Sequence, residues 1–287
     1  MMKKTTGIQK RKKVENSVGH IFLTILGILW ILPILWLIMV SFREEPGSFT
    51  SYIIPKGFTL DNYRNLFFDT DLFNFPRWFM NTLFVAVFSA AISTVIILAT
   101  SYAFSRLRFR LRKQMMDIIL ILGMFPGFMA MIAVYHILKA IGLDQSLYAL
   151  ILVYSGGAAM GYYISKGFFD TIPKSIDESA MLDGASRSQI FWQITLPLSK
   201  PIIVYTILTS FIAPWVDFIF VSVIMRDNYA NYTVALGLYK MLERENIYQY
   251  FTQFAAGAVI IAIPITILFI YMQKYYVEGV TGGSVKG

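Results

Sequence analysis

The stretch of sequence that decides this fold reads Pro173-Lys-Ser-Ile-Asp-Glu-Ser-Ala-Met-Leu-Asp-Gly-Ala-Ser-Arg-Ser-Gln-Ile-Phe-Trp-Gln-Ile-Thr-Leu-Pro-Leu-Ser-Lys-Pro201. Ser175 and Glu178 have the spacing of a capping box, which predicts that a short helix begins there. Gly184 suits the left-handed residue that ends such a helix. Ser186 and Gln189 repeat the capping-box spacing, so a second short helix is expected directly after the first.

Two prolines bound the second helix. Pro197 ends it, and Pro201 fits the first turn of the membrane helix that follows. The apolar residues of the stretch recur at near-helical spacings: Ile176, Ala180, Ile190, Phe191 and Ile194. These features predict a rigid helical knob with apolar faces. From the pattern alone, the faces lie on the membrane surface, on the chain's own helices or on a partner protein.

The same stretch resembles the signature cytoplasmic loop of binding-protein-dependent ABC importer permeases. That motif is Glu-Ala-Ala, then Gly after three residues, then Ile-x-Leu-Pro after nine more, and here Ser179 replaces the first Ala. In these permeases the loop is the coupling helix that docks into a cleft of the ATPase subunit, and the resemblance implies that role here. The residues that carry it are Glu178, Ala180, Asp183, Gly184, Ile194, Leu196 and Pro197.

The composition is that of a membrane protein. Of the 287 residues, 56% are hydrophobic and only 15% are charged, whereas soluble domains carry about 25% charged residues. The chain has no cysteine, which excludes disulfides and thiol chemistry. Its first apolar run is longer than the h-region of a signal peptide, so we expect a span rather than a cleaved leader.

Charge-poor runs long enough to cross a bilayer predict an all-α polytopic membrane protein with six transmembrane helices. The expected spans are 18–42, 78–103, 116–138, 145–168, 201–225 and 250–273. We treat residues 1–287 as a single permease domain, with a coupling loop at 173–200 and a cytoplasmic tail at 274–287. The resemblance implies the fold of type I ABC importer permeases.

Other segments extend the resemblance over nearly the whole chain. They are Phe58–Tyr63, Asn81–Leu83 and Tyr102–Phe109. The polar segment 43–77 is long for a simple turn, so we expect it to carry structure of its own.

The basic residues predict the orientation. With a cytoplasmic N-terminus, the inside segments hold 17 of the 25 Lys and Arg residues and the outside segments hold eight. This bias follows the positive-inside rule and places the knob and both termini in the cytoplasm. It also explains the net charge of +8 without nucleic acid.

No constellation for covalent chemistry is apparent. The sequence has no Gly-x-x-x-x-Gly-Lys-Ser/Thr, so we expect no ATP site and no enzymatic activity in this chain. His20 and His136 lack the spacing of metal ligands. We therefore predict no catalytic residue, no metal site and no cofactor here, with ATP and Mg²⁺ bound by a partner ATPase.

Asp217 interrupts the expected fifth span, after Pro214 and Trp215. At about 1.5 Å per residue it lies about 24 Å from Pro201, in the outer half of the membrane. An intramembrane carboxylate usually faces a cavity or a partner, so we assign Trp215 and Asp217 to the pathway or its gate. The alternative is a side chain that snorkels to the interface. The resembled permeases usually have Trp-Asn-Glu or Trp-Asn-Asp here, and Val216 departs from that Asn.

The tail ends in a glycine-rich run that resembles the C-terminus of maltose-type permeases, where it reaches between the ATPase subunits. Gly282, Gly283 and Lys286 are the candidate contacts. The alternative is a disordered end.

The resemblance implies a permease subunit of an ATP-driven importer in a prokaryotic cytoplasmic (inner or plasma) membrane. It would form half of the pathway for a sugar or oligosaccharide, such as a maltodextrin. The implied partners are a second homologous permease, two ATPase subunits, an extracytoplasmic solute-binding protein and membrane lipid, but no nucleic acid. The alternatives are a permease for a non-sugar solute and an ion-coupled secondary transporter, although the latter needs coupling sites in matched halves.

Overall fold

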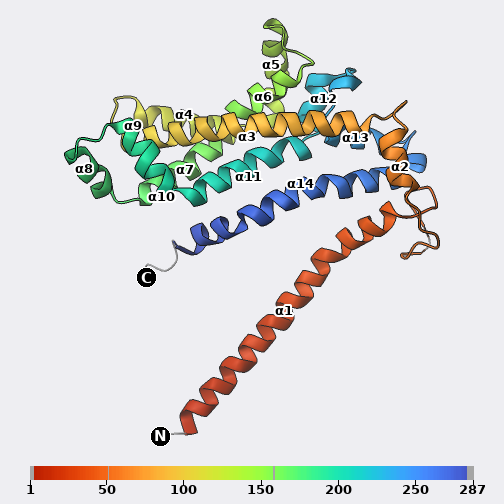
Figure 1. Cartoon of the computed structure of the whole chain (residues 1–287), viewed down its shortest axis with the longest axis horizontal. Coiled ribbons are helices and arrows are strands. Elements are labelled where there is room, and N and C mark those ends of the chain that lie inside the picture. Colours follow the sequence, from red (N-terminus) through yellow and green to blue (C-terminus); the bar gives the residue numbers. More distant parts are fainter. Residues whose placement is uncertain (1–2, 51, 158, 283–287) are drawn as a thin grey trace. The chain divides into compact units, whose positions relative to one another are not determined.

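The structure is a computed structural model that describes residues 3–50, 52–157 and 159–282. Within those residues the regular structure is helical, apart from one isolated antiparallel bridge between Arg43 and Phe58. The helices form two compact units, Met1–Phe68 with Leu242–Val259 and Asp69–Met241 with Ile260–Gly287. Figure 1 labels the elements. The all-α architecture predicted from the apolar runs is confirmed.

The first unit contains α1 (Lys3–Ser41), α2 (Asp61–Phe68) and the start of α14 (Ile247–Gly282). Asn62 joins them, because its Nδ2 donates to the backbone oxygens of Ser41 and Arg43 at 3.0 and 2.8 Å. The hydroxyl of Thr252 donates to its Oδ1 at 2.8 Å. Segment 43–77 therefore carries structure of its own, as predicted.

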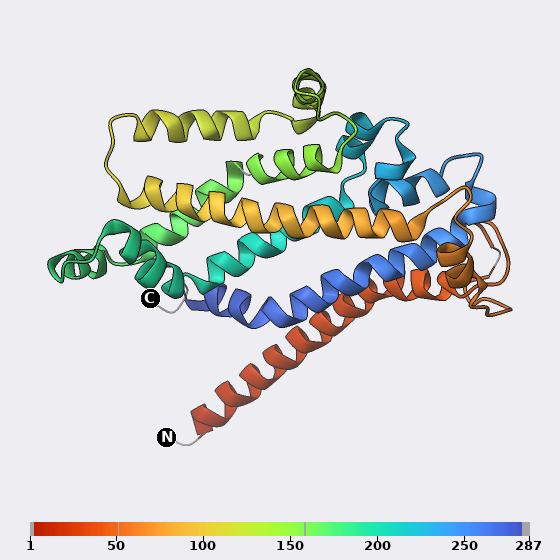
Figure 2. The same cartoon turned by 45° about the horizontal axis from the view of Figure 1, so that its top comes forward.

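The second unit is built around α3 (Phe75–Arg106), the long helix in its centre (Figures 1 and 2). Three helices pack along it: α6 (Leu147–Gly156), α7 (Ala159–Thr171) and α11 (Lys200–Val216). The contact face of α3 is rich in small buried residues, which let membrane helices approach closely. They are Ala86, Ser89, Ala90, Ser93, Ser101 and Ser105.

Among the described residues, three helices are long and apolar enough to cross a membrane, at Glu15–Ser41, Phe75–Arg106 and Ile247–Tyr275. The number of spans rises to as many as six if each bent helix pair is one span. The predicted spans 78–103 and 250–273 lie within the last two. The predicted span 116–138 is broken into α4 (Arg112–Met124) and α5 (Gly127–Ala140), bent by 103°. Pro126 stands at the break, where it cannot donate a helical hydrogen bond.

The predicted spans 145–168 and 201–225 are also interrupted. The first breaks after Gly156, between α6 and α7. The second breaks at Asp217 and Phe218, between α11 and α12 (Ile219–Met225), while Pro214 stays inside α11. The segment predicted as a separate tail from residue 274 instead continues α14 as far as Gly282.

The N-terminal part of α3 is fastened to the segment that precedes and includes α13 (Val234–Met241). Nδ2 of Asn81 donates to the backbone oxygens of Ala230 and Tyr232, both at 2.9 Å; Ala230 lies in the short 3-10 helix η2 (Tyr229–Asn231). Gly237 lies so close to Trp78 that an added Cβ would be 2.0 Å from the indole ring. Only glycine therefore fits this contact.

We predict that Gly237→Ala lowers the stability of the protein in detergent, because the new methyl group must displace the buried Trp78 ring. Overpacking of this kind typically costs about 1–3 kcal/mol. Thermal unfolding of the purified chain measures the loss. Gly167→Ala on α7 is the matched control, because an added Cβ there meets nothing within 4 Å. Equal melting temperatures for the two variants would contradict the close contact.

Candidate functional site

The knob begins with α8 (Lys174–Leu182), which starts directly after Pro173. Pro173 occupies the N-cap position, with ψ at 131°, and no side chain caps the helix. The predicted capping box of Ser175 and Glu178 is therefore wrong. An N-cap residue needs a non-helical backbone. Because the helix already begins after Pro173, Ser175 lies inside its first turn and cannot be the N-cap.

Gly184 ends α8 as predicted. Its φ of +84° lies in the left-handed region, which glycine adopts without steric cost. The amide of Ala185 donates to the oxygen of Ala180 at 2.9 Å, and that of Gly184 donates to Met181 at 3.1 Å. These bonds satisfy the last carbonyl groups of the helix and turn the chain back on itself.

The second capping box is confirmed. The Ser186 amide donates to Oε1 of Gln189 at 2.8 Å, and the Gln189 amide donates to the Ser186 hydroxyl at 3.3 Å. The helix runs through α9 (Arg187–Gln189), the π-helix η1 (Ile190–Thr195) and α10 (Leu196–Leu198). It then bends by 83° into α11, which has Pro201 in its first turn.

A buried ion pair fixes the base of the knob. Nε of Arg106, at the end of α3, lies 3.0 Å from Oδ2 of Asp177 on α8, and the two side chains are only 3% and 10% exposed. Nη2 of Arg106 also donates to the backbone oxygen of Ile172 at 2.8 Å. Removing one partner of a buried pair typically costs about 3–5 kcal/mol, so α8 is held firmly at the end of α3.

An aromatic cluster extends this attachment. The ring centroids of Tyr102 and Phe191 lie 4.8 Å apart, and Phe169 meets Tyr102 edge-on at 6.1 Å. Leu98 and Ile202 complete the buried cluster. The apolar face of the second knob helix therefore packs against the chain's own helices, which is one of the three alternatives that the sequence pattern allowed.

The far end of α8 is exposed. Leu182 keeps 90% of its surface accessible, and Glu178, Asp183 and Gly184 are exposed around it. Ala180 is buried at 8% exposure. The motif residues thus separate into an exposed tip on α8 and a base, where Ile194 and Leu196 are partly buried and Pro197 is exposed.

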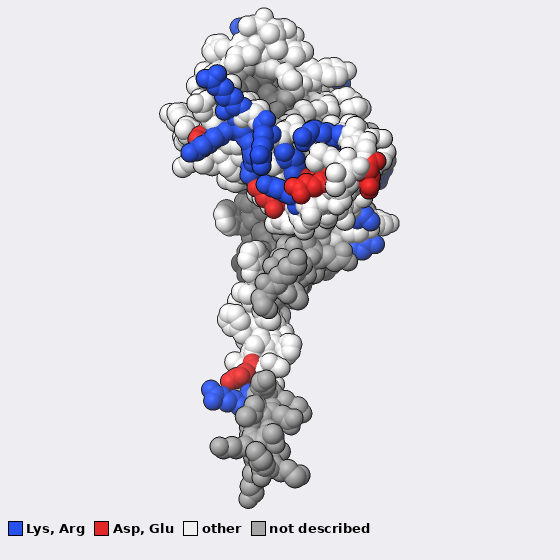
Figure 3. Space-filling model, turned by 90° about the vertical axis from the view of Figure 1, so that its left-hand side faces the viewer, with Lys and Arg blue, Asp and Glu red and all other residues white. Residues whose placement is uncertain are grey.

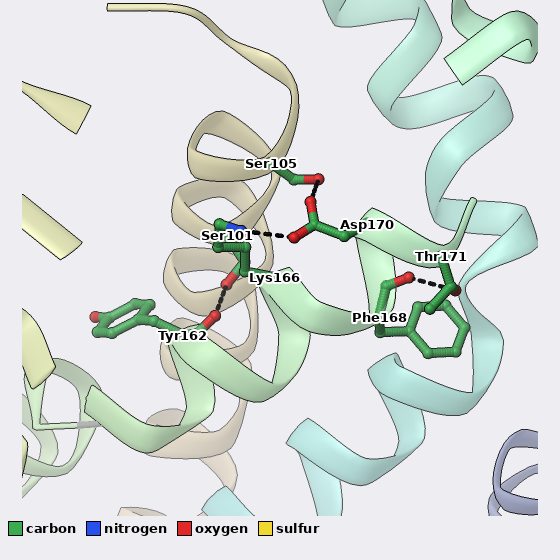
Figure 4. Close-up of polar contacts among 7 residues, drawn as sticks. All are labelled: Ser101, Ser105, Tyr162, Lys166, Phe168, Asp170 and Thr171. Carbon is green, nitrogen blue, oxygen red and sulfur yellow. Dashed lines mark hydrogen bonds and ion pairs between the residues drawn. The ribbon is translucent and has the colours of Figure 1, made fainter. Parts of the chain in front are cut away.

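A polar seam joins α3 to α7, the helix that leads into the knob (Figure 4). Oγ of Ser101 donates to the backbone oxygen of Tyr162 at 3.0 Å. One turn further, Oγ of Ser105 donates to Asp170 at 2.6 Å, and Lys166 donates to the other carboxylate oxygen at 2.6 Å. The seam fixes the register of the two helices just above the knob.

A cavity of about 620 Å³ lies deeper in the second unit, between α3, α5, α6, α7, α11 and α12. Apolar and small polar side chains line it, together with Asp217 and Tyr154. The lining includes Ser93, Ile97, Met131, Val134, Tyr205, Thr206, Thr209, Ser210 and Phe220. Such a mixed lining suits an uncharged polar solute better than an ion.

Asp217 is satisfied inside the chain. The hydroxyl of Tyr154 donates to Oδ2 at 2.9 Å, and the amide of Phe220 donates to Oδ1 at 3.0 Å. The carboxylate therefore links α6 to the break between α11 and α12. Trp215 is not among the residues that line the cavity. It is 2% exposed and packs edge-on against Phe79 at 5.2 Å.

Of the candidate tail contacts, Gly282 is the last residue of α14. Gly283 and Lys286 lie outside the residues that the structure describes.

Three residues of the site escaped the sequence analysis as functional residues: Arg106, Asp177 and Tyr154. Arg106 ends the Tyr102–Arg106 stretch, and Asp177 lies next to the motif residue Glu178. Arg106 and Asp177 therefore lie in segments that the sequence analysis quoted, but neither residue was assigned a role there. Nothing in the sequence pairs them, because their contact exists only once α8 folds back on α3.

Comparisons with known proteins agree with this architecture. The family model described as the binding-protein-dependent transport system inner membrane component matches residues 95–282. The galactooligosaccharides transport system permease protein GanQ of Bacillus subtilis is 37% identical over 278 residues, covering 96% of this chain and 98% of that protein. The maltodextrin transport system permease protein MalD of Streptococcus pneumoniae is 36% identical over 283 residues, covering 98% of this chain and 99% of that protein.

A solved structure shares the fold. A chain in the crystal structure of a bacterial ABC transporter involved in the import of the acidic polysaccharide alginate matches with a TM-score of 0.76 at 24% identity, covering 92% of this chain and 97% of that chain. The motif on the knob, the family match and the relatives over the full length lead to one assignment. The chain belongs to the binding-protein-dependent transport system inner membrane components, the ABC importer permeases that its knob resembles.

Proposed function

We propose that this chain is a permease subunit of an ATP-driven importer and forms half of the pathway for a sugar or oligosaccharide. The relatives named for galactooligosaccharide and maltodextrin transport support the substrate class. The cavity beside Tyr154 and Asp217, with its aromatic, hydroxyl and apolar lining, supports the passage of such a solute through this subunit.

One observation carries the mechanism: the buried pair of Arg106 and Asp177 joins α8 to the same helix that lines the cavity. Movement of the exposed tip of α8 is therefore transmitted to α3, whose Ser93 and Ile97 face the cavity. Alternating access then follows from two arrangements of the helices around the cavity. An ATPase that binds ATP more tightly in one arrangement biases the equilibrium between them.

The proposed partners follow from the family. Its description makes transport dependent on a binding protein. A second alginate transporter structure, with a TM-score of 0.63 at 17% identity, contains a periplasmic protein bound to an alginate pentasaccharide. A solute-binding protein therefore delivers the substrate. Two ATPase subunits contact the knobs, and a second, similar permease supplies the other half of the pathway.

The proposed orientation places the knob and both termini in the cytoplasm. Lys and Arg side chains gather at the end of the second unit that carries α8 and α9 (Figure 3). Such an excess is typical of the cytoplasmic side, where an ATPase can reach the exposed tip. The tail at the end of α14 is proposed as a further ATPase contact.

Substitutions at the tip test the proposed ATPase contact. We expect Glu178→Lys to reduce uptake at least tenfold with normal protein levels, because Glu178 is exposed and its reversal changes the surface of the knob rather than its buried core. Gly184→Asp should do the same by straining the left-handed turn. Uptake of labelled oligosaccharide in cells measures the effect. The control is Ser188→Asp, an exposed knob position outside the motif, and normal uptake in Glu178→Lys would refute the contact.

The division of labour between subunits gives a second expectation. The purified chain alone should not hydrolyse ATP, because it has no P-loop, whereas the co-purified complex should hydrolyse ATP faster when loaded binding protein is added. A colorimetric phosphate assay measures both rates. ATP hydrolysis by the isolated chain that survives removal of contaminating ATPases would contradict the proposal.

Asp217 tests the pathway. Asp217→Asn should change uptake, or uptake per ATP hydrolysed, by about tenfold with little loss of assembled complex, since the amide oxygen can still accept from the Phe220 amide while the charge and the oxygen that accepts from Tyr154 are lost. Tyr154→Phe removes the same hydrogen bond from the other side and should have a similar effect. Asp217→Leu should in addition lower the yield, because each buried donor left unpaired costs about 1–3 kcal/mol. Full uptake in Asp217→Leu would remove the residue from the pathway.

A further inference from the structure

A second cavity, of about 570 Å³, lies at the base of the knob, between the connection from α3 to α4 and helix α8. Basic side chains dominate its wall. They are Arg106, Arg108, Arg112, Lys174 and Arg187, against the carboxylates of Asp177 and Glu178. Two of the seven charges cancel within the wall, because Asp177 forms its ion pair with Arg106.

Three of the remaining cations have no ion-pair partner among the described residues. In the described part of the chain, no ion pair is formed by Arg108, Lys174 or Arg187. Glu178 is the one other carboxylate on the wall. Cations that converge on a concave surface with so few anions create a site for a negatively charged ligand.

The buried guanidinium of Arg106 has one donor without a partner in the protein. Its side chain is 3% exposed, with Nε beside Asp177 and Nη2 bonded to Ile172. Nη1 is buried and has no hydrogen-bond partner. A buried donor left without a partner is costly, and a planar guanidinium pairs well with the oxygens of a phosphate group.

The position of the cavity indicates where the phosphate comes from. Arg106 is the last residue of the apolar helix Phe75–Arg106, so the cavity lies at one end of an expected membrane span. Phe109 and Met181 line the cavity and are each 40% exposed, and the neighbouring Leu111 is 53% exposed. Apolar side chains at the mouth suit an acyl chain. Basic pockets beside transmembrane helices at the cytoplasmic face recurrently bind anionic headgroups.

We propose that this cavity binds the phosphate headgroup of an anionic phospholipid, with Arg106, Arg108 and Lys174 as its principal contacts. The lipid would bridge the α3–α4 connection and α8, and so hold the knob against the membrane-spanning helices. Its assignment to the cytoplasmic leaflet rests on the proposed orientation, but the binding itself does not depend on transport.

Native mass spectrometry of the full-length chain in a non-ionic detergent tests the proposal. The chain is titrated with dioleoyl phosphatidylglycerol, with dioleoyl phosphatidylcholine as the neutral comparison. We expect phosphatidylglycerol to bind selectively. The double variant Arg108→Gln/Lys174→Gln should weaken it about 30-fold, equivalent to about 2 kcal/mol at 1.4 kcal/mol per tenfold. Arg106 is left intact, because its ion pair supports the fold.

The double variant Arg110→Gln/Lys113→Gln is the matched control. It also removes two positive charges, but Arg110 and Lys113 line a neighbouring cavity. Equal weakening by this control would reduce the effect to diffuse positive charge and overturn the site. Displacement of the lipid by glycerol phosphate at similar concentration would make the ligand a soluble phosphate and overturn the lipid assignment. Equal binding of phosphatidylglycerol and phosphatidylcholine would also overturn the lipid assignment.

Discussion

The buried ion pair between Arg106 and Asp177 is the interaction on which the rest of this structure depends. Two charges removed from water are stable only when their geometry is held closely, and here the aromatic cluster around Tyr102 and Phe191 holds it. The pair makes the end of α3 and the start of the knob a single rigid piece. In the proposed mechanism, the exposed tip of α8 therefore moves together with the helix that lines the cavity.

The polar side chains of the second unit have two different structural roles. On the α3–α7 seam, Ser101, Ser105 and Lys166 make short contacts that set one fixed register. At the cavity, Asp217 instead joins Tyr154 to the break between two helix segments. Irregular backbone at membrane depth is tolerated where protein or a water-filled cavity satisfies it. In the proposed mechanism, the rigid seam transmits motion and the broken helix gives the cavity wall a place to move.

The broken helices also explain why the expected spans and the observed helices differ. Apolar runs measure only the length available to cross a bilayer, and by that measure six spans are available when each bent pair counts as one. The breaks come from single residues: Pro126 lacks an amide donor, and Asp217 takes the amide of Phe220 with its side chain. The hydrophobicity of a run of residues does not register either helix break, although Pro126 and Asp217 can both be read from the sequence.

The sequence by itself determined the all-helical membrane class, the fixed spacing of the knob motif, the turn at Gly184 and the capping box of Ser186 and Gln189. Each depends on apolar length or on hydrogen bonds that reach only a few residues along the chain. The predicted capping box of Ser175 and Glu178 was wrong because Pro173 takes the N-cap position and the helix begins directly after it. Only the tertiary structure decided that Arg106 pairs with Asp177 and that Tyr154 bonds to Asp217. Those partners lie far apart in sequence, and their pairing depends on how whole helices pack, which no local pattern encodes.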